Sequence, residues 1–553
     1  MTSAFWKRCV RRRDARCRSD RNDYRKRRRD IAMLTQVMNL GNLLTEVARR
    51  HPDEPGLIIG DTVHTWRAIN TRVDALAHAL RERGIGHGDK ILVHSRNNLP
   101  MFESAWVAFK LGAVWVPTNV RMTPTEVAYL GESSGAKVMI YDTGYAAYVD
   151  AVQAGGLLEH VVAMTAPRDG ELDFEALATG PATVFDAAAV DRDDPIWFFY
   201  TSGTTGHPKA GMLTHGQFAF VINNHLADLM PGLTYRSRSL AVAPLSHGAG
   251  IHAVINAARG AATILPLSDK LDPQEVWQLV ERHRVDNMFT VPTIVKMLTE
   301  DPAVDRYDHS SLRFVIYAGA PMYRADQCHA LKKLGQVLVQ YYGLGEVTGN
   351  ITVLPAWLHT ADDNAPNARV GTCGYARTGM EIAILDADGQ CQKPFATGEI
   401  CVRGPAVFIG YYNNPEANQK SFKHGWFHTG DLGHLDEEGF LYITGRASDM
   451  YISGGSNVYP REIEEALLKH PAVHEVAVLG MPDAKWGESG VAVVVCKPGQ
   501  SVDAQALLAH IEPCIAKYKW PRQFLFWDSL PKSGYGKIVK KTIRAMLEQE
   551  QTV

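Results

Sequence analysis

Apolar segments of two lengths alternate through the first part of the chain and limit what it can fold into. Within residues 40–195, segments with helical periodicity at 42–51 and 66–83 are followed by short apolar runs at 90–94 and 138–141. Short apolar runs between turn residues are typical of buried strands. Strands that alternate with amphipathic helices form mostly parallel sheets covered by those helices. The sequence therefore predicts an α/β protein.

The same alternation continues through residues 217–340, with expected strands at 239–243, 286–290 and 314–318. From about residue 370 the pattern changes to short strands separated by turns, which predicts a smaller β-rich subdomain. The expected strands of that subdomain are 380–386, 398–404 and 439–444.

After Gly445 the sequence predicts a compact α+β tail. Pro460 stands at the first position of a helical stretch, where proline is favoured because the N–H that it lacks has no intrahelical acceptor there. The expected elements are a helix at 460–469, strands at 475–479 and 491–496, and a helix at 504–511.

Charge and cysteine content exclude several classes of protein. The 553 residues carry a formal net charge of −2, so no global field marks a nucleic-acid or membrane partner. No run of 18 apolar residues is present, which excludes a membrane-spanning helix. The eight cysteines form no CxxC pair, which argues against a disulfide framework or a zinc site and fits a reducing compartment. We expect a cytoplasmic protein.

The first 32 residues differ from the rest of the chain. From Lys7 to Arg29 there are thirteen Lys or Arg residues against three Asp, with almost nothing apolar to bury. We expect a disordered arm, or an upstream stretch that precedes the true start at Met33. A basic arm for nucleic acid or anionic lipid is the alternative.

The most informative segment is a loop rich in glycine and hydroxyl groups, between an apolar strand at 196–200 and Lys209. Glycines let backbone N–H groups approach an anion, hydroxyls add donors and the lysine adds a positive charge. The GxxxxGK[ST] nucleotide loop is absent. We expect a different phosphate-binding loop, formed by Thr201, Ser202, Gly203, Thr204, Thr205 and Gly206.

Residues 201–209 resemble the signature of the adenylate-forming superfamily, which comprises acyl-CoA synthetases, firefly-type luciferases and peptide-synthetase adenylation domains. The resemblance covers residues 35–545, with the motifs in family order. It implies that ATP and a carboxylic acid form an acyl-adenylate with release of pyrophosphate. Coenzyme A then takes the acyl group and AMP leaves. Thr201, Lys209, Glu346 and Lys537 are the catalytic residues that it implies.

The stretch that ends at Glu346 is similar to the family segment in which an aromatic ring flanks adenine and a glutamate binds Mg²⁺. Carboxylate oxygens suit Mg²⁺, so Glu346 is the expected metal ligand. Gly345 stands where the family usually has threonine. Unless water or Thr201 replaces the missing hydroxyl, we expect Gly345→Thr to speed adenylation. The nucleotide-binding residues implied here are Gln340, Tyr341, Tyr342 and Gly343.

Three further segments resemble family motifs. Gly319, Ala320 and Pro321 correspond to the wall shared by the adenine and the acyl group, and His247 to the mouth of the acyl pocket. In the third segment, Asp431 would accept both ribose hydroxyls.

Two cations complete the implied site. Arg446 corresponds to a second ribose and phosphate contact. Lys537, in a glycine-flanked loop, corresponds to the lysine that bridges the carboxylate and the α-phosphate during adenylation. A cation placed there would stabilise the charge that develops in the transition state.

By the same resemblance, residues 33–444 form an N-terminal domain that binds ATP and the acyl group. Residues 445–448 form a hinge, in which Ser448 takes the place of the usual Asp or Lys, and residues 449–553 form a small mobile C-terminal domain. In its rotated state, a loop of that domain would line the coenzyme A tunnel with Ser453, Gly454 and Gly455.

The sequence leads to an AMP-forming acyl-CoA synthetase, an acid–thiol ligase, with a medium- or long-chain fatty acid as the expected substrate. The alternatives are an aryl- or cinnamate-type CoA ligase and a stand-alone adenylation enzyme that loads a carrier protein. A different class is a nucleotide-binding regulator with weakened catalysis, suggested by Gly345 and Ser448. Whether the protein forms a homodimer stays open.

Overall fold

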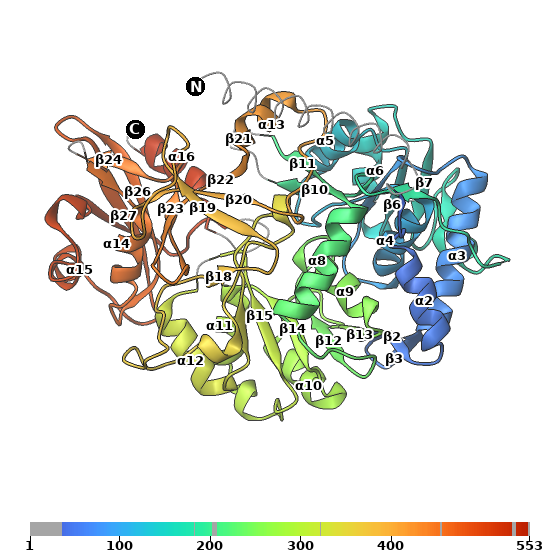
Figure 1. The fold of residues 1–553 in the computed structure, drawn as a ribbon, viewed down its shortest axis with the longest axis horizontal. Coiled ribbons are helices and arrows are strands. Elements are labelled where there is room, and N and C mark those ends of the chain that lie inside the picture. The colour runs from blue at the N-terminus through green and yellow to red at the C-terminus, as the bar shows by residue number, and fades with distance from the viewer. Residues whose placement is uncertain are drawn as a thin grey trace, which may run out of the picture.

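The computed structural model describes residues 36–181, 183–201, 207–320, 322–453, 456–532 and 538–550. The basic arm at residues 1–32 lies outside this part of the chain. The fold is α/β, with a large N-terminal domain and a smaller C-terminal domain (Figure 1), as the sequence predicts. None of the helices in the described ranges is long and apolar enough to cross a bilayer.

The first sheet has seven strands in the order β11-β10-β5-β4-β6-β7-β8. All of its neighbouring strands are parallel except β11, which folds back antiparallel on β10. The hairpin between β10 and β11 spans the predicted phosphate loop. The strands are β4 (Lys90–His94), β5 (Val114–Pro117), β6 (Val138–Tyr141), β7 (His160–Ala163), β8 (Leu172–Asp173), β10 (Pro195–Thr201) and β11 (Lys209–Thr214).

The second sheet also has seven strands, in the order β16-β15-β14-β12-β13-β2-β3. Only β3 is antiparallel to its neighbour. The carboxyl ends of its parallel strands lead into the segments that carry predicted site residues. The strands are β2 (Pro55–Ile59), β3 (Thr62–Thr65), β12 (Arg238–Ala241), β13 (Ala262–Leu265), β14 (Asn287–Thr290), β15 (Phe314–Tyr317) and β16 (Leu338–Gln340).

One apolar core joins the two sheets through α8 and α9, which lie between them in Figure 1. Thr214 and Gln217 start α8 directly after β11, because each side chain accepts the backbone N–H of the other in a capping box. The helices of these units are α2 (Asn42–Arg50), α3 (Trp66–Glu82), α4 (Leu99–Leu111), α5 (Pro124–Ser134), α6 (Ala146–Gln153), α7 (Phe174–Ala178), α8 (His215–Asp228), α9 (Gly248–Ala258), α10 (Pro273–His283), α11 (Pro292–Glu300) and α12 (Arg324–Leu334).

The predicted β-rich subdomain is a sheet of five strands. Its order is β19-β20-β22-β21, with β23 on the other part of the long strand β22. Two small ribbons, β1 with β9 and β17 with β18, lie elsewhere in the N-terminal part. The elements are β1 (Gln36–Val37), β9 (Val190–Asp191), β17 (Thr352–Val353), β18 (Tyr375–Ala376), β19 (Glu381–Leu385), β20 (Gly398–Arg403), β21 (Phe422–Lys423), β22 (Trp426–Leu435), β23 (Leu441–Arg446) and α13 (Pro415–Ser421).

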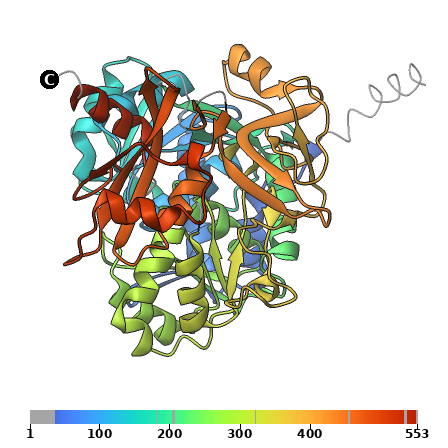
Figure 2. The same cartoon turned by 90° about the vertical axis from the view of Figure 1, so that its left-hand side faces the viewer.

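The C-terminal unit has its own sheet, β25-β24-β27-β26 with β28 on β27, covered by three helices. In Figures 1 and 2 this unit, drawn in red, lies beside the β-rich sheet in orange and near α12. Its elements are β24 (Tyr451–Ser453), β25 (Ser456–Val458), β26 (Val473–Asp483), β27 (Gly487–Cys496), β28 (Gln523–Phe526), α14 (Pro460–Leu467), α15 (Ala504–Ile511) and α16 (Lys540–Glu550).

Candidate active site

A buried carboxylate lies at the end of β10. Glu346, in a short 3-10 helix (Gly345–Val347), is 5% exposed, and its Oε1 accepts hydrogen bonds from Thr201 Oγ1 and Tyr411 OH, each at 2.9 Å. Two hydroxyl donors hold this carboxylate in one place, and burial together with the Glu346 charge raises the pKa of Tyr411. The structure thus brings together the expected metal ligand and the first residue of the predicted phosphate loop.

Lys209 enters the same site from the other strand of the hairpin. It pairs with Thr201 across the β10–β11 ladder, and its Nζ lies 5.3 Å from the centre of the Tyr411 ring. The predicted loop residues between these two positions, Ser202, Gly203, Thr204, Thr205 and Gly206, lie outside the described residues.

A second acidic site lies where β22 and β23 pair. Asp431 and Arg446 are register partners, with Arg446 Nε 3.3 Å from Asp431 Oδ1, and Tyr342 OH donates to Asp431 Oδ2 at 2.6 Å. Burial, followed by the Asp431 charge, raises the pKa of Tyr342 well above its usual 10. The phenol therefore stays protonated and works as a donor, and it links the predicted adenine and ribose residues.

Side-chain hydrogen bonds and close backbone packing fix the segments at the ends of β15 and β16, near the Tyr342–Asp431 pair. Gln340 Oε1, at the end of β16, accepts a hydrogen bond from Tyr317 OH at 3.0 Å. A Cβ atom at Gly343 would lie 2.3 Å from the carbonyl carbon of Gly349, so this close backbone approach requires glycine. Gly319 has a φ of 83° and follows β15, with Ala320 next to it. The remaining member of that wall, Pro321, lies outside the described residues.

His247, the residue expected at the mouth of the acyl pocket, packs against a residue of β10 beside the carboxylate site. It is the residue before α9, and its ring centre is 4.4 Å from that of Phe199 in β10. Phe199 also fills the space beside Gly345, where a Cβ atom would lie 2.5 Å from Phe199 Cδ1 and 3.0 Å from Thr201 Cγ2. A threonine side chain at position 345 would therefore collide with the Phe199 ring, which argues against the expectation that Gly345→Thr speeds adenylation.

Two site residues could not be found from the sequence. Tyr411 and Phe199 carry no local signal, because each acts through a partner far along the chain, Glu346 for Tyr411 and Gly345 for Phe199. A tyrosine that opens a pair of tyrosines and a phenylalanine within an apolar strand are both typical of ordinary core residues.

The predicted coenzyme A and hinge positions belong to the C-terminal part. Ser453 ends β24, while Gly454, Gly455 and the predicted catalytic Lys537 lie outside the described residues. Ser448 Oγ donates to Asp449 Oδ1 at 3.2 Å. Before it, Gly445 has a φ of 154° with open space around its Cβ position.

Comparison with known proteins bears on this arrangement. The model of the AMP-binding enzyme family matches residues 44–412, and that of the AMP-binding enzyme C-terminal domain matches residues 462–537. A feruloyl-CoA synthase from Amycolatopsis sp is 35% identical over 91% of this chain and 98% of its own length.

A long-chain-fatty-acid–CoA ligase, FadD13 of Mycobacterium tuberculosis, is 34% identical over 88% of this chain and 93% of its own. Among solved structures, o-succinylbenzoate CoA synthetase (MenE) from Bacillus subtilis, in complex with an acyl-adenylate intermediate, has a TM-score of 0.79. It is 29% identical and covers 91% of this chain, which covers 98% of that structure.

Proposed function

Because the chain belongs to the AMP-binding enzyme family and is an ATP-dependent acyl-CoA synthetase, we propose that its two half-reactions share the site built around Glu346 and Asp431. The observation that carries this proposal is that one segment, residues 342–346, supplies a member of each of two pairs: Glu346 accepts a hydrogen bond from Thr201, and Tyr342 donates one to Asp431. The first pair offers a place for phosphate and metal, the second a place for the ribose of ATP.

Glu346 is the proposed ligand of Mg²⁺. Its buried carboxylate is held by two neutral hydroxyls, and hard carboxylate oxygens suit this ion. When bound, Mg²⁺ would neutralise charge on the ATP phosphates. Thr201 and Lys209 would bind phosphate oxygens at the mouth of the hairpin, Thr201 through its hydroxyl and Lys209 through its charge.

Asp431 is the proposed acceptor for both ribose hydroxyls, with Arg446 beside it. The Tyr342 ring then flanks adenine while its hydroxyl fixes the Asp431 carboxylate. The backbone of Gly319 and Ala320 and the side chain of Gln340 complete the nucleotide wall. These groups position ATP so that the carboxylate of the acid can attack the α-phosphorus.

Lys537 is the proposed cation of the adenylation step, acting on charge that develops between the acid carboxylate and the α-phosphate. Residues 33–444 and 449–553 are the proposed domains, joined by a hinge at 445–448. Rotation there would withdraw Lys537 and bring Ser453, Gly454 and Gly455 to the site, where the thiol of coenzyme A attacks the acyl carbon and AMP leaves.

The proposed acid is a medium- or long-chain fatty acid, with an aryl acid as the second candidate. FadD13, named for long-chain fatty acids, and the feruloyl-CoA synthase are similarly close to this chain. The aryl candidate is favoured by a flat wall behind His247, in which the rings of His252, Phe289 and Tyr341 lie within 20° of parallel. Such a wall can stack on an aromatic ring.

The testing experiment is ATP–pyrophosphate exchange with a panel of fatty and aryl acids, followed by acyl-CoA formation for each acid that exchanges. We expect exchange without coenzyme A and thioester formation only with it. Nucleotide binding without exchange for any acid would favour the regulator. Exchange followed by transfer only to a carrier protein would favour the adenylation enzyme.

The cytoplasm is the proposed location, since the cysteines in the described part of the chain are free thiols.

A further inference from the structure

The wall behind His247 leads away from the phosphate end of the site. Phe199 packs against His247, and both Phe199 and Thr201 lie beside Gly345. After His247, the helix α9 starts with Gly248, whose Cβ position lies 2.5 Å from Phe289. Phe289 stacks on His252 with ring centres 4.6 Å apart and planes 13° apart. His247 is the expected mouth of the acyl pocket, so an acid that enters past His247 would direct its other end toward this wall.

Buried polar atoms gather beyond the wall. Of the buried side-chain nitrogen and oxygen atoms that lack a hydrogen-bond partner among the described residues, nearly half belong to Asn224, His225, His252, Asn350 and Arg377. Each of these side chains is at least nine-tenths buried. Buried polar groups in folded proteins are almost always paired, so such a gathering is unusual and points to a missing partner.

Arg377 is the cation of this cluster. It is 1% exposed, and its Nε and Nη1 have no hydrogen-bond partner among the described residues. Its ion-pair partner, Asp228, lies 3.7 Å from Nε, while the two Asp228 oxygens accept from the backbone N–H and the hydroxyl of Thr378. Burial lowers the pKa of Arg377 to about 9, so the group remains charged at neutral pH. Asp228 balances this charge, and the Nε and Nη1 donors are left without a hydrogen-bond partner among the described residues.

The neighbouring histidine cannot satisfy these donors. His225 Nδ1 lies 3.2 Å from Arg377 Nη2 and 3.0 Å from the carbonyl oxygen of Val221. One ring nitrogen either accepts from Arg377 or donates to Val221, and cannot do both. In either tautomer one polar group of the Arg377–His225 pair is left without a partner, and His225 Nε2 has none in the described chain.

His252 adds a second imidazole ring to the same cluster. Its ring centre is 5.2 Å from that of His225, and neither of its nitrogens has a hydrogen-bond partner among the described residues. Burial, and then Arg377, lowers its pKa to about 3, so the ring is neutral and offers one donor and one acceptor.

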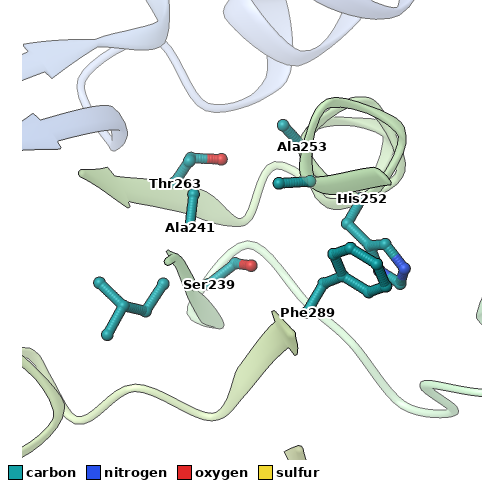
Figure 3. Close-up of a pocket in the computed structure, with 8 residues that line it drawn as sticks. Ser239, Ala241, His252, Ala253, Thr263 and Phe289 are labelled. Carbon is teal, nitrogen blue, oxygen red and sulfur yellow. The ribbon is translucent and has the colours of Figure 1, made fainter. Parts of the chain in front are cut away.

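Figure 3 shows which way the His252 ring faces. The ring lies against Phe289, and the ring nitrogen that can be seen is turned away from Ser239, Ala241 and Thr263. The cavity on the side of those three residues measures about 10 Å³, which is room for about one water molecule and none for an acyl group.

We propose, on the basis of the acyl-activating function above, that Arg377, His225 and His252 form the far end of the acyl pocket. There they bind an uncharged oxygen acceptor, such as a hydroxyl, carried by the acid at the end remote from its reacting carboxyl. Asp228 already balances the Arg377 charge, so a second carboxylate would add an unpaired negative charge to a buried site. A plain alkyl or phenyl end leaves the donors unpaired, which also costs binding.

The test compares matched acids on the full-length enzyme through kcat/KM for AMP release with coenzyme A. The pairs are octanoate against 8-hydroxyoctanoate and cinnamate against 4-hydroxycinnamate, with octanedioate as the charged probe. We expect the hydroxylated member of at least one pair to be favoured by about 10- to 100-fold, because sites built to bind a hydroxyl discriminate strongly against its absence.

The outcomes separate this proposal from the function on which it rests. If no acid of the panel supports pyrophosphate exchange, the proposed function fails. If both members of each pair react equally well, the proposed acyl-activating function is upheld and the proposed polar subsite is wrong. A preference for octanedioate over 8-hydroxyoctanoate would overturn the uncharged occupant.

Two variants assign the preference to the named residues. Arg377→Met and His252→Phe, the latter keeping the ring stack, should each lower kcat/KM far more for the hydroxylated acid than for the unsubstituted acid, so that the preference within each pair is lost. Arg403→Met, at an exposed ion pair with Glu381, is the matched control and should keep the preference. Equal losses for both acids in both variants would mean that the cluster only stabilises the fold, and would overturn the proposal.

Discussion

At the scale of single residues, the Phe199 ring fills the space that a side chain at position 345 would need. A ring carbon of Phe199 would lie 2.5 Å from any Cβ atom at position 345, and overpacking of this kind typically costs about 1–3 kcal/mol. We predict that Gly345→Thr slows adenylation by about tenfold or more, at tenfold per 1.4 kcal/mol, because Phe199 is pushed toward His247 and Thr201. Pyrophosphate exchange measures the effect.

The control for this prediction is a double-mutant cycle. Phe199→Leu removes ring volume beside position 345, so Phe199→Leu combined with Gly345→Thr should recover most of the lost rate, whereas two independent effects would add. If Gly345→Thr alone is as fast as the native enzyme, the ring moves freely and the coupling does not exist.

Lys537 carries a second prediction at this scale. Lys537→Ala should lose adenylation by orders of magnitude, because its proposed partner is charge that develops only as the anhydride forms. The same variant supplied with preformed acyl-adenylate and coenzyme A should still make acyl-CoA. Lys532→Ala, which removes a nearby lysine paired with Glu475, should leave both steps unchanged. If Lys537→Ala slows both steps equally, Lys537 does not act specifically in adenylation.

The site residues show what a sequence can reveal at this scale. Thr201, Glu346 and Asp431 could be proposed as site residues because each stands in a short segment that resembles a family motif: a hydroxyl-rich loop, or an acid after a glycine turn. Their partners Tyr411 and Tyr342 depend on tertiary contacts, since the donor to each carboxylate comes from 65 and 89 residues away. No local pattern encodes such a pairing.

At the scale of elements, the apolar runs predicted the positions of the strands well, but they predicted the residues at which the strands begin and end less well. β4 and β6 coincide with the predicted runs, whereas β26 and β27 continue for several residues beyond theirs. The extra pairs include Gly480 with Gly490, where the pattern shows no apolar residue. The backbone of the partner strand decides which residues pair. At position 480 a glycine is required, because a Cβ atom there would lie 2.1 Å from the Cβ atom of Tyr451.

The segment between β23 and β24 carries the prediction at this scale. Ser448→Pro fixes φ near −65° and also restricts Ala447, so it should hold the two proposed domains in one orientation. We expect one half-reaction to slow strongly and the other to be spared, as measured by pyrophosphate exchange and by thioester formation from preformed acyl-adenylate.

Ser448→Ala is the control for the hinge, since it removes only the hydrogen bond to Asp449 and leaves the backbone free. It should retain both half-reactions. If Ser448→Pro slows both steps to the same extent, residues 445–448 are not the pivot.

At the scale of the whole molecule, composition and alternation were enough to predict an α/β protein with a β-rich part and an α+β tail. They could not show that α8 and α9 would join two separate seven-stranded sheets into one core. Helical periodicity shows that a helix is buried and does not say against what, and α9 is buried over almost its whole surface.

The basic segment before Met33 carries the last prediction, because it bears on what the whole molecule needs in order to fold. With thirteen positive residues between Lys7 and Arg29 and almost nothing apolar, it cannot offset the entropy of ordering by burial. A chain that starts at Met33 should keep the melting temperature and the rate of acyl-CoA formation. It retains β1, whose Val37 pairs with Val190 in β9, and Leu40, which is 1% exposed. A chain that starts at Asn42 lacks both and should melt lower, since deleting a buried leucine side chain typically costs about 2–5 kcal/mol. If the Met33 chain aggregates, or loses activity at low salt while the full chain does not, the segment is a working part of the enzyme and binds an anionic partner.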